Sequence, residues 1–365
     1  MSVVIKNYPY PISNQLVVGC RKILKACQVK DGSKVLLLTA TNYYQQHIVN
    51  SYYQAALDLG AKSILITTEP FQIPGVFGKD VIKVPEPIEA AIWASDFVLF
   101  LGINIFYTPV LERIKERKKP AFFAYNSEFS TEWLITRYPP PCEPVVIRGE
   151  AGVDLLKNTS EVRYTTPAGT DLVMGIKRGG ETKEIGFLQP DKGHTWDILA
   201  GAGIYAFLEP GSSNGKLVIA PGDYPSQIVD REHGFPYTGD KITITVKNGK
   251  ITKIEGSVGA KLLDQWFRSW EAESSYEMCH MGIGTDPRQR RDFERYPFYG
   301  VSGWDGEWIE GLINLGIGYE PSHLDIMLRH GTVWFDKDKV LEDEKFVGPL
   351  SDEVLGIKSK QSRKC

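Results

Sequence analysis

The first 145 residues alternate between short apolar runs and longer stretches in which apolar positions recur at helical spacing. The runs predict buried strands and the stretches between them predict helices. Because strands separated by helices pair in parallel, this part predicts an open, mostly parallel α/β sheet. The expected strands are 35–39, 63–67, 96–101 and 121–124, and the expected helices are 43–59, 85–94 and 111–118.

The turn after the first expected strand is Ala40-Thr41-Asn42, which has no glycine. A dinucleotide-binding fingerprint requires glycines at this point, where the backbone approaches the pyrophosphate. The sequence therefore predicts a Rossmann-like domain that has no dinucleotide cofactor.

Prolines cluster at 139–141, and the pattern beyond them changes to short strands and glycine-rich turns. Residues 161–165 and 171–176 look paired, and Asn248-Gly249 suits the type I′ turn of a hairpin over 241–255. A helix is expected over 261–271. We therefore expect an α/β domain at 1–143 and a β-rich α+β catalytic domain at 144–365.

Composition excludes several classes of protein. The net charge of −3 argues against a nucleic-acid surface, and the five scattered cysteines form no CxxC pair and suggest no disulfide framework. The N-terminus lacks the apolar stretch of a signal peptide, and no segment has the roughly 20 apolar residues of a membrane helix. A cytoplasmic protein with neither a nucleic-acid nor a membrane partner is expected.

Two histidines stand in unusual settings. His323 and Asp325 are two residues apart, so in an extended segment their side chains point the same way and can chelate one ion. His280 comes from a separate segment beside two glycines. Two imidazoles and one carboxylate form the ligand set of non-haem Fe(II) oxygenases. An HxD pair also arises by chance, with the histidine bonded to backbone and the aspartate capping a turn.

The C-terminal part resembles the superfamily that contains the M29 (AmpS-type) aminopeptidases and the 2,5-dihydroxypyridine 5,6-dioxygenases. The resemblance covers roughly residues 150–350 and is carried by the segments 215–221, 280–287, 314–318, 323–327 and 332–336. It implies Fe(II)-dependent ring cleavage of a small hydroxylated N-heteroaromatic such as 2,5-dihydroxypyridine, with dioxygen as co-substrate. It also implies a homo-oligomer.

At three positions this chain differs from the aminopeptidase branch, and these differences favour the dioxygenase branch. The aminopeptidase branch has Glu, Glu and His at the positions that resemble Lys216, His280 and Asn314 here. Lys216 is a cation and Asn314 is a poor ligand, so the resemblance implies that the two-metal site of the hydrolases is lost. One metal bound by His280, His323 and Asp325 is what remains.

Other residues are expected to assist. His194 is a candidate base because its ordinary pKa lies near neutrality, although it also fits an exposed loop histidine. Arg295 and Tyr299 could hold a substrate oxygen, or be a loop arginine with an aromatic ring packed over it. Glu209 could orient a ligating imidazole, or be an exposed turn carboxylate.

Three rival interpretations stay open at this point. The first is a metal-dependent aminopeptidase or amidohydrolase with two ions per chain. The second is a metal-free binding protein that keeps only the fold. The third is a different oxygen-dependent or hydrolytic reaction at the same mononuclear site, because fold and ligands do not fix the substrate.

Overall fold

The computed structural model of this chain forms two compact units. The first unit holds the described residues up to Pro141 together with Gly186–Leu199, and the second holds Cys142–Ile185 and the described residues from Gly201 onward. The structure describes residues 12–41, 43, 45–69, 84–103, 105, 108–124, 130–137, 139–199, 201–225, 239–289, 304–319 and 322–358.

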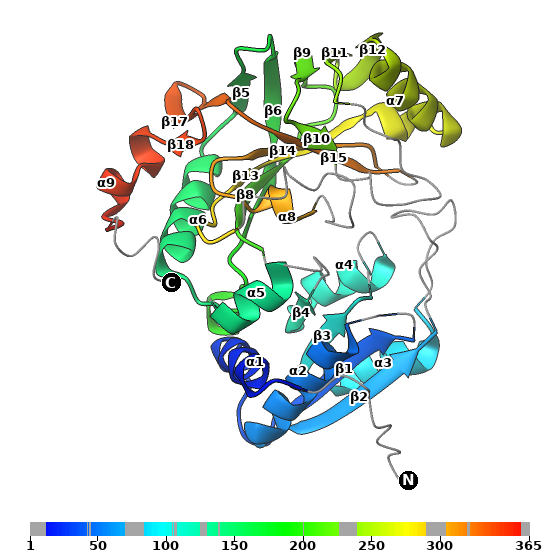
Figure 1. The fold of residues 1–365 in the computed structure, drawn as a ribbon, viewed down its shortest axis with the longest axis vertical. Helices are drawn as coiled ribbons and strands as arrows, with labels where there is room; N and C mark the ends of the chain where they lie inside the picture. Colours follow the sequence, from blue (N-terminus) through cyan, green and yellow to red (C-terminus); the bar gives the residue numbers. More distant parts are fainter. Residues whose placement is uncertain are drawn as a thin grey trace. The chain divides into compact units, whose positions relative to one another are not determined.

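The first unit is built on a parallel sheet with the strand order β2-β1-β3-β4-β7 (Figure 1). Its central strands are apolar runs buried along their whole length, as parallel strands covered on both faces must be. The strands are β1 (Lys34–Ala40), β2 (Lys62–Thr68), β3 (Phe97–Leu101), β4 (Ala121–Ala124) and β7 (Trp196–Leu199). The helical elements are α1 (Asn14–Ala26), α2 (Gln46–Asp58), α3 (Glu86–Ala94), α4 (Pro109–Glu116), α5 (Ser130–Arg137) and η1 (Pro190–Lys192).

Strand β7 departs from the expected division of the chain. Residues 144–365 were all assigned to the second domain, whereas Gly186–Leu199 belong to the first unit. The reason is that Trp196–Leu199 pair in parallel with Ala121–Ala124 and so complete the first sheet. A four-residue strand in a glycine-containing loop gives too weak a periodic signal to reveal this return of the chain.

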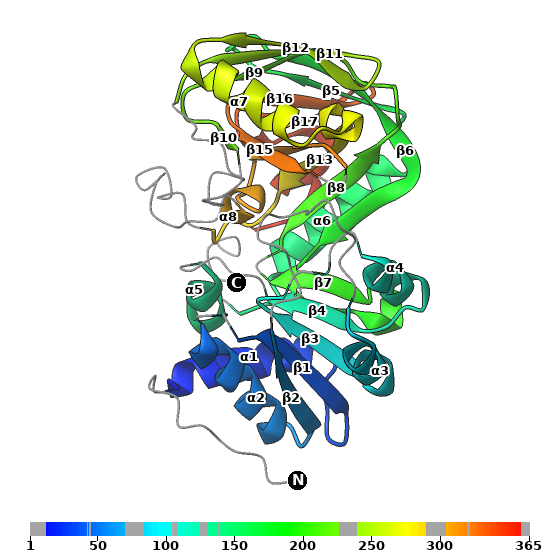
Figure 2. The same cartoon turned by 90° about the vertical axis from the view of Figure 1, so that its right-hand side faces the viewer.

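The second unit is built on a thirteen-stranded sheet whose strands pair antiparallel (Figure 2). The hairpin at Asn248-Gly249 is confirmed, and both residues have positive φ, as a type I′ turn needs. The strands are β5 (Glu161–Thr165), β6 (Asp171–Glu184), β8 (Gly203–Leu208), β9 (Asn214–Ile219), β10 (Tyr224–Pro225), β11 (Ile242–Lys247), β12 (Lys250–Gly256), β13 (Met278–Gly284), β14 (Ile313–Ile317), β15 (Leu324–Leu328), β16 (Thr332–Phe335), β17 (Asp338–Glu342) and β18 (Lys345–Phe346).

Helices cover part of this sheet. In α6, Gly152 lies so close to the sheet that a Cβ there would come within 2.2 Å of the Ile204 side chain. In α7, Leu263, Trp266 and Phe267 enter the core. The helical elements are α6 (Glu143–Leu156), α7 (Val258–Ser269), η3 (Glu273–Tyr276), α8 (Trp304–Glu307), η5 (Gly348–Leu350) and α9 (Asp352–Leu355). The predicted class, an α/β sheet followed by a β-rich α+β region, is confirmed.

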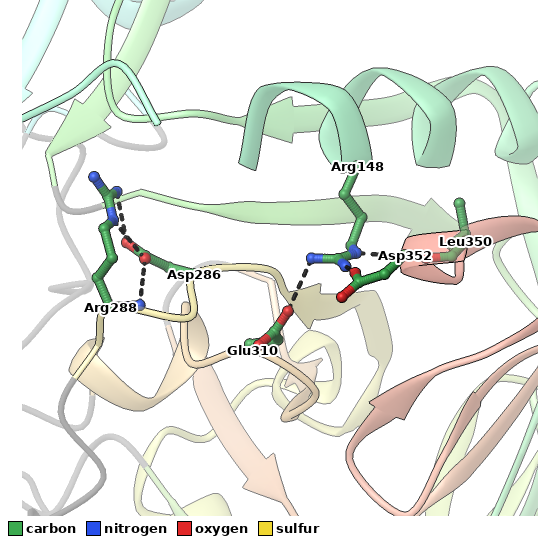
Figure 3. A network of polar contacts seen from close by, with 6 residues as sticks. All are labelled: Arg148, Asp286, Arg288, Glu310, Leu350 and Asp352. Carbon is green, nitrogen blue, oxygen red and sulfur yellow. Dashed lines mark hydrogen bonds and ion pairs between the residues drawn. The ribbon is translucent and has the colours of Figure 1, made fainter. Parts of the chain in front are cut away.

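A buried arginine joins three distant segments of the second unit (Figure 3). Arg148 on α6 is 1% exposed, donates to Glu310 at 2.9 Å and pairs with Asp352. Its guanidinium also lies over the Phe346 ring. Close by, Arg288 donates twice to Asp286, which follows β13. The pair with Glu310 thus ties α6 to the loop before β14, one of the strands that carry the site described next.

Among the described helices, none is both long and apolar enough to cross a membrane.

Candidate metal centre

Strands β15, β14, β13 and β8 lie side by side in that order, and their side chains alternate between two faces. One face, here called the core face, is aliphatic and buried in the hydrophobic core; it comprises Ile204, Ala206, Met281, Ile283, Leu315, Ile317, Leu324 and Ile326. The opposite face, here called the site face, comprises Tyr205, Phe207, His280, Gly282, Asn314, Gly316, Asp325 and Met327.

The three predicted ligands meet on the site face. Cross-strand pairing puts His280 opposite Gly316, and Gly316 opposite Asp325. His323 lies just before β15, two residues from Asp325, as the spacing predicted. One donor atom from each of the three side chains falls within 4.8 Å of the others.

The donor distances suit a common ion. Oδ1 of Asp325 lies 3.1 Å from Nε2 of His280 and 3.2 Å from Nε2 of His323. Two ligands that each lie about 2.1 Å from an ion and bind at right angles are about 3.0 Å apart. The observed contacts therefore fit a divalent cation with neighbouring coordination positions occupied. Imidazole and carboxylate groups that face one another away from bulk water also form the donor set of such sites.

Gly316 makes this convergence possible. A Cβ at that position would lie 2.2 Å from Cε1 of the His280 ring and 2.3 Å from its Nδ1. Any other residue would collide with the imidazole, because real Cβ atoms do not approach so closely. The glycine thus leaves the space through which His280 reaches across β14 toward Asp325.

The orientation of His323 is fixed by the backbone. Its Nδ1 lies 2.8 Å from the carbonyl oxygen of Gly318, which can accept a hydrogen bond from the ring. With Nδ1 engaged in this way, Nε2 is the ring nitrogen that faces Asp325 and would bind a metal. Gly318 has φ +94, a conformation that favours glycine, and this holds the carbonyl in place. The orienting partner is therefore a main-chain group.

The electrostatics of the site call for a cation. Burial raises the pKa of Asp325, but the His323 and His280 imidazoles outweigh this and hold it well below its usual range. Burial lowers the pKa of His280, whereas hydrogen bonding to Asp325 and Cys279 raises it to about 9. These shifts show that the site favours positive charge beside the carboxylate. A divalent ion would supply that charge.

More buried polar groups lie on the same side. Asn314, two residues from Gly316, is fully buried, and neither atom of its amide has a partner of hydrogen-bond geometry among the described residues. Glu307 is also buried, and its pKa is raised well above normal by burial and then by the charges of Asp325 and Glu184, while the Asn314 amide lowers it. The Tyr205 hydroxyl is buried as well. Sequence spacing gave no indication of Glu307 or Tyr205.

His194 lies in the first unit, in the loop before β7. Its Nε2 is 2.6 Å from Oδ2 of Asp197, a carboxylate that is completely buried. Oδ1 of the same aspartate accepts a hydrogen bond from the backbone of Ile198. His194 is thus a partly buried imidazole held by an aspartate, and not a freely exposed loop histidine.

The remaining predicted residues stand apart from the three ligands or cannot be placed. Glu209 is exposed in the turn after β8, where its backbone bonds to Gly175 and Ser212. Of the two interpretations of Glu209, the structure therefore favours the exposed turn carboxylate. Lys216 is exposed on β9. Arg295 and Tyr299 lie outside the described residues.

Two imidazoles and one carboxylate that converge from one sheet face define a class of metal-dependent enzymes with coordination positions open to substrate. The family model for 2,5-dihydroxypyridine 5,6-dioxygenase matches residues 15–348, so the chain belongs to that family. The name of the family denotes ring-cleaving dioxygenation of a dihydroxypyridine.

Individual proteins agree with this assignment. The chain is 24% identical, over 93% of its length and 98% of the relative's, to 2,5-dihydroxypyridine 5,6-dioxygenase of Pseudomonas putida strain KT2440. The solved structure of the dioxygenase from that strain has a TM-score of 0.82 at 22% identity and covers 93% of this chain and 99% of that one. AmpT from Thermus thermophilus has a TM-score of 0.60 at 12% identity, over 93% and 100% of the two chains. The expected resemblance to the dioxygenase family is thus confirmed, and AmpT shares the fold.

Proposed function

We propose that this protein is an Fe(II)-dependent dioxygenase that opens the ring of 2,5-dihydroxypyridine or a closely related hydroxylated N-heteroaromatic. The observation that carries the proposal is the approach of both Nε2 atoms to Oδ1 of Asp325, within a chain of the dihydroxypyridine dioxygenase family. His280, His323 and Asp325 would hold the ion. When bound, Fe(II) supplies a position for a ring hydroxyl and the electron density that dioxygen requires.

The protein's own groups have distinct tasks in this proposal. The stacked rings of His280 and His323, 5.2 Å apart and inclined by 24°, present their nitrogens to the same point. Because the ligands are buried, water is excluded from most of the site and the charge interactions within it are strong. A role for His194 as a base stays a prediction; Asp197 holds the orientation of its ring.

The experiment is anaerobic loading with Fe(II), followed by metal analysis and by oxygen uptake on a panel of dihydroxypyridines and catechols. We expect one iron per chain and uptake with 2,5-dihydroxypyridine. Two divalent ions per chain, together with peptide hydrolysis, would instead identify an aminopeptidase. A chain that binds no metal but retains the small molecule would be a binding protein.

Two variants test the ligands directly. His323→Ala and Asp325→Ala should each lower iron affinity and turnover by more than about 100-fold, since even partners beyond the ligands commonly cost 10- to 100-fold. The matched control is His330→Ala, which removes an exposed imidazole paired with Asp343. The control should keep its iron and its activity, and full activity in either ligand variant would refute the assignment.

Self-association and a cytoplasmic location stay predictions. Light scattering of the purified chain and fractionation of the cells that produce it would test them.

A further inference from the structure

The site face is buried almost everywhere, and Phe207 is the exception among its described members. Its exposed fraction is 38%, whereas Tyr205, Asn314, Asp325 and Met327 are all buried. Of the three candidate ligands, the neighbouring His280 has the most exposed side chain, at 14% against 6% and 7%. The site face therefore opens to solvent beside Phe207 and His280.

Phe207 lies directly against the ligand. It pairs with His280 across β8 and β13, which places the two side chains on the same face. Their ring centroids are 6.3 Å apart and the rings are inclined by 73°, an edge-to-face arrangement. Tyr205 contacts His280 in the same manner from the other side, at 6.2 Å, but it is buried.

A bulge in the next strand lies beside Phe207. The register of β6 with β8 jumps from Ile176, opposite Leu208, to Glu181, opposite Ala206. Residues 177–180 therefore bulge out beside Phe207. Gly180 fits there because a Cβ would lie 2.9 Å from the Lys177 carbonyl oxygen and 3.0 Å from the Cβ of Phe207. Bulges of this kind often redirect side chains next to functional sites.

Single exposed apolar side chains are common on protein surfaces, and what sets Phe207 apart is its edge-to-face contact with a candidate metal ligand. A planar heteroaromatic that binds the ligands beside His280 would lie within reach of the Phe207 ring. We propose that Phe207 is a specificity-determining residue whose ring packs against the aromatic ring of the substrate. This inference rests on the proposed function. Phe207 would supply the apolar contact with the substrate, and the metal ligands would supply the polar ones.

The test compares Phe207→Ala, Phe207→Leu and Phe207→Tyr with the wild type, each loaded with Fe(II). Anaerobic binding of 2,5-dihydroxypyridine, kcat, KM, iron content and oligomer size are measured. Phe207→Ala should weaken binding and raise KM by about 5- to 30-fold, the factor that corresponds to losing 1–2 kcal/mol of contact. We expect kcat to change less than about threefold and iron content to be unchanged. Phe207→Tyr should restore binding, and Phe207→Leu should be intermediate.

The control is Val258→Ala, which removes an apolar side chain of 58% exposure on α7. It should leave every parameter at the wild-type value. Unchanged binding and KM in Phe207→Ala would overturn the proposal, as would a loss of binding explained entirely by dissociation of subunits. A wild-type enzyme that binds iron but neither binds nor oxidises the pyridine would instead refute the proposed function, and this inference with it.

Discussion

The two faces of the sheet formed by β8, β13, β14 and β15 are both largely buried, but they are chemically opposite. On the core face, Leu315 and Ile317 pack among aliphatic side chains. On the site face of the same strand, Asn314 and Gly316 lie beside two imidazoles and a carboxylate. A single alternation of side chains thus generates both the hydrophobic core and the candidate metal centre.

This difference shows that the degree of burial does not distinguish a structural from a functional face. Burial of aliphatic groups stabilises the fold at roughly 25 cal/mol per Å². Burial of Asp325, Glu307 and the Asn314 amide costs free energy unless each finds a partner. The site face is therefore expected to be stabilised by its ligands, and the core face by its own packing. Substitutions on the two sides of β14 should separate these effects.

The largest effect is expected from Gly316→Ala. The added methyl group would take the space of the His280 ring and push that ligand away from Asp325. Iron affinity and turnover should each fall by about 100-fold or more, a loss at least as large as that from removing an orienting partner. Metal titration and oxygen uptake measure the two losses.

The fold of this variant should persist, because the ring has room to move toward solvent. An unfolding midpoint of the metal-free variant close to that of the metal-free wild type would support this. A Gly316→Ala variant that keeps wild-type iron affinity would show that His280 does not need the space above the glycine.

Leu315→Ala, one residue away on the core face, is expected to lower the stability of the fold and to leave iron binding intact. Leu315 is completely buried, so the truncation should lower the free energy of unfolding by about 2–5 kcal/mol. The folded fraction should still bind one iron per chain. Urea denaturation of the metal-free protein gives the first quantity. A loss of iron binding larger than the loss of folded protein would mean that the two faces are not independent.

A smaller effect, dependent on pH, is expected from Asp223, which lies beside the end of β15. Its carboxylate accepts hydrogen bonds from the backbone of Ala220 and Arg329, yet burial raises its pKa to about 6. The ordinary pKa is about 3.9, so the folded state binds this proton more tightly. The stability from the bound proton is complete below pH about 4 and is lost as the pH rises through 6.

Asp223→Asn removes this titration. The unfolding free energy of the wild type, minus that of the variant, should fall by about 1–3 kcal/mol between pH 4 and pH 7, since one pKa unit corresponds to about 1.4 kcal/mol. Parallel denaturation series at the two pH values measure this difference. A difference that stays constant or grows with pH would contradict the assignment.

Local chemistry made much of the molecule predictable. The run at 35–39 is contained in β1, and the expected helix over 43–59 becomes α2 with its end at Asp58. The Asn248-Gly249 turn fixed the hairpin because few residues tolerate its positive φ. The two-residue spacing of His323 and Asp325 anticipated their common direction, because alternation along a strand depends on local geometry alone.

What escaped prediction depends on partners distant in sequence. The clearance above Gly316 exists only because His280 pairs across from it. The surroundings of Glu307 depend on Asp325 and Glu184, which come from two other strands. In the sequence alone, Phe207 is an ordinary apolar strand residue. Its place beside a candidate ligand follows only from its pairing with His280. Cross-strand register, which the single sequence does not display, decides the first and the third, and the packing of α8 decides the surroundings of Glu307.

The insertion of β7 in the first sheet has a consequence for any attempt to divide the protein. The chain leaves the first unit at Pro141, returns at Gly186 and departs again before Gly201. A fragment that ends at the proline cluster would lack the strand next to β4 and expose the backbone of Ala121–Ala124 as an open edge. Such a fragment is expected to aggregate, so the two halves must be expressed as a single polypeptide.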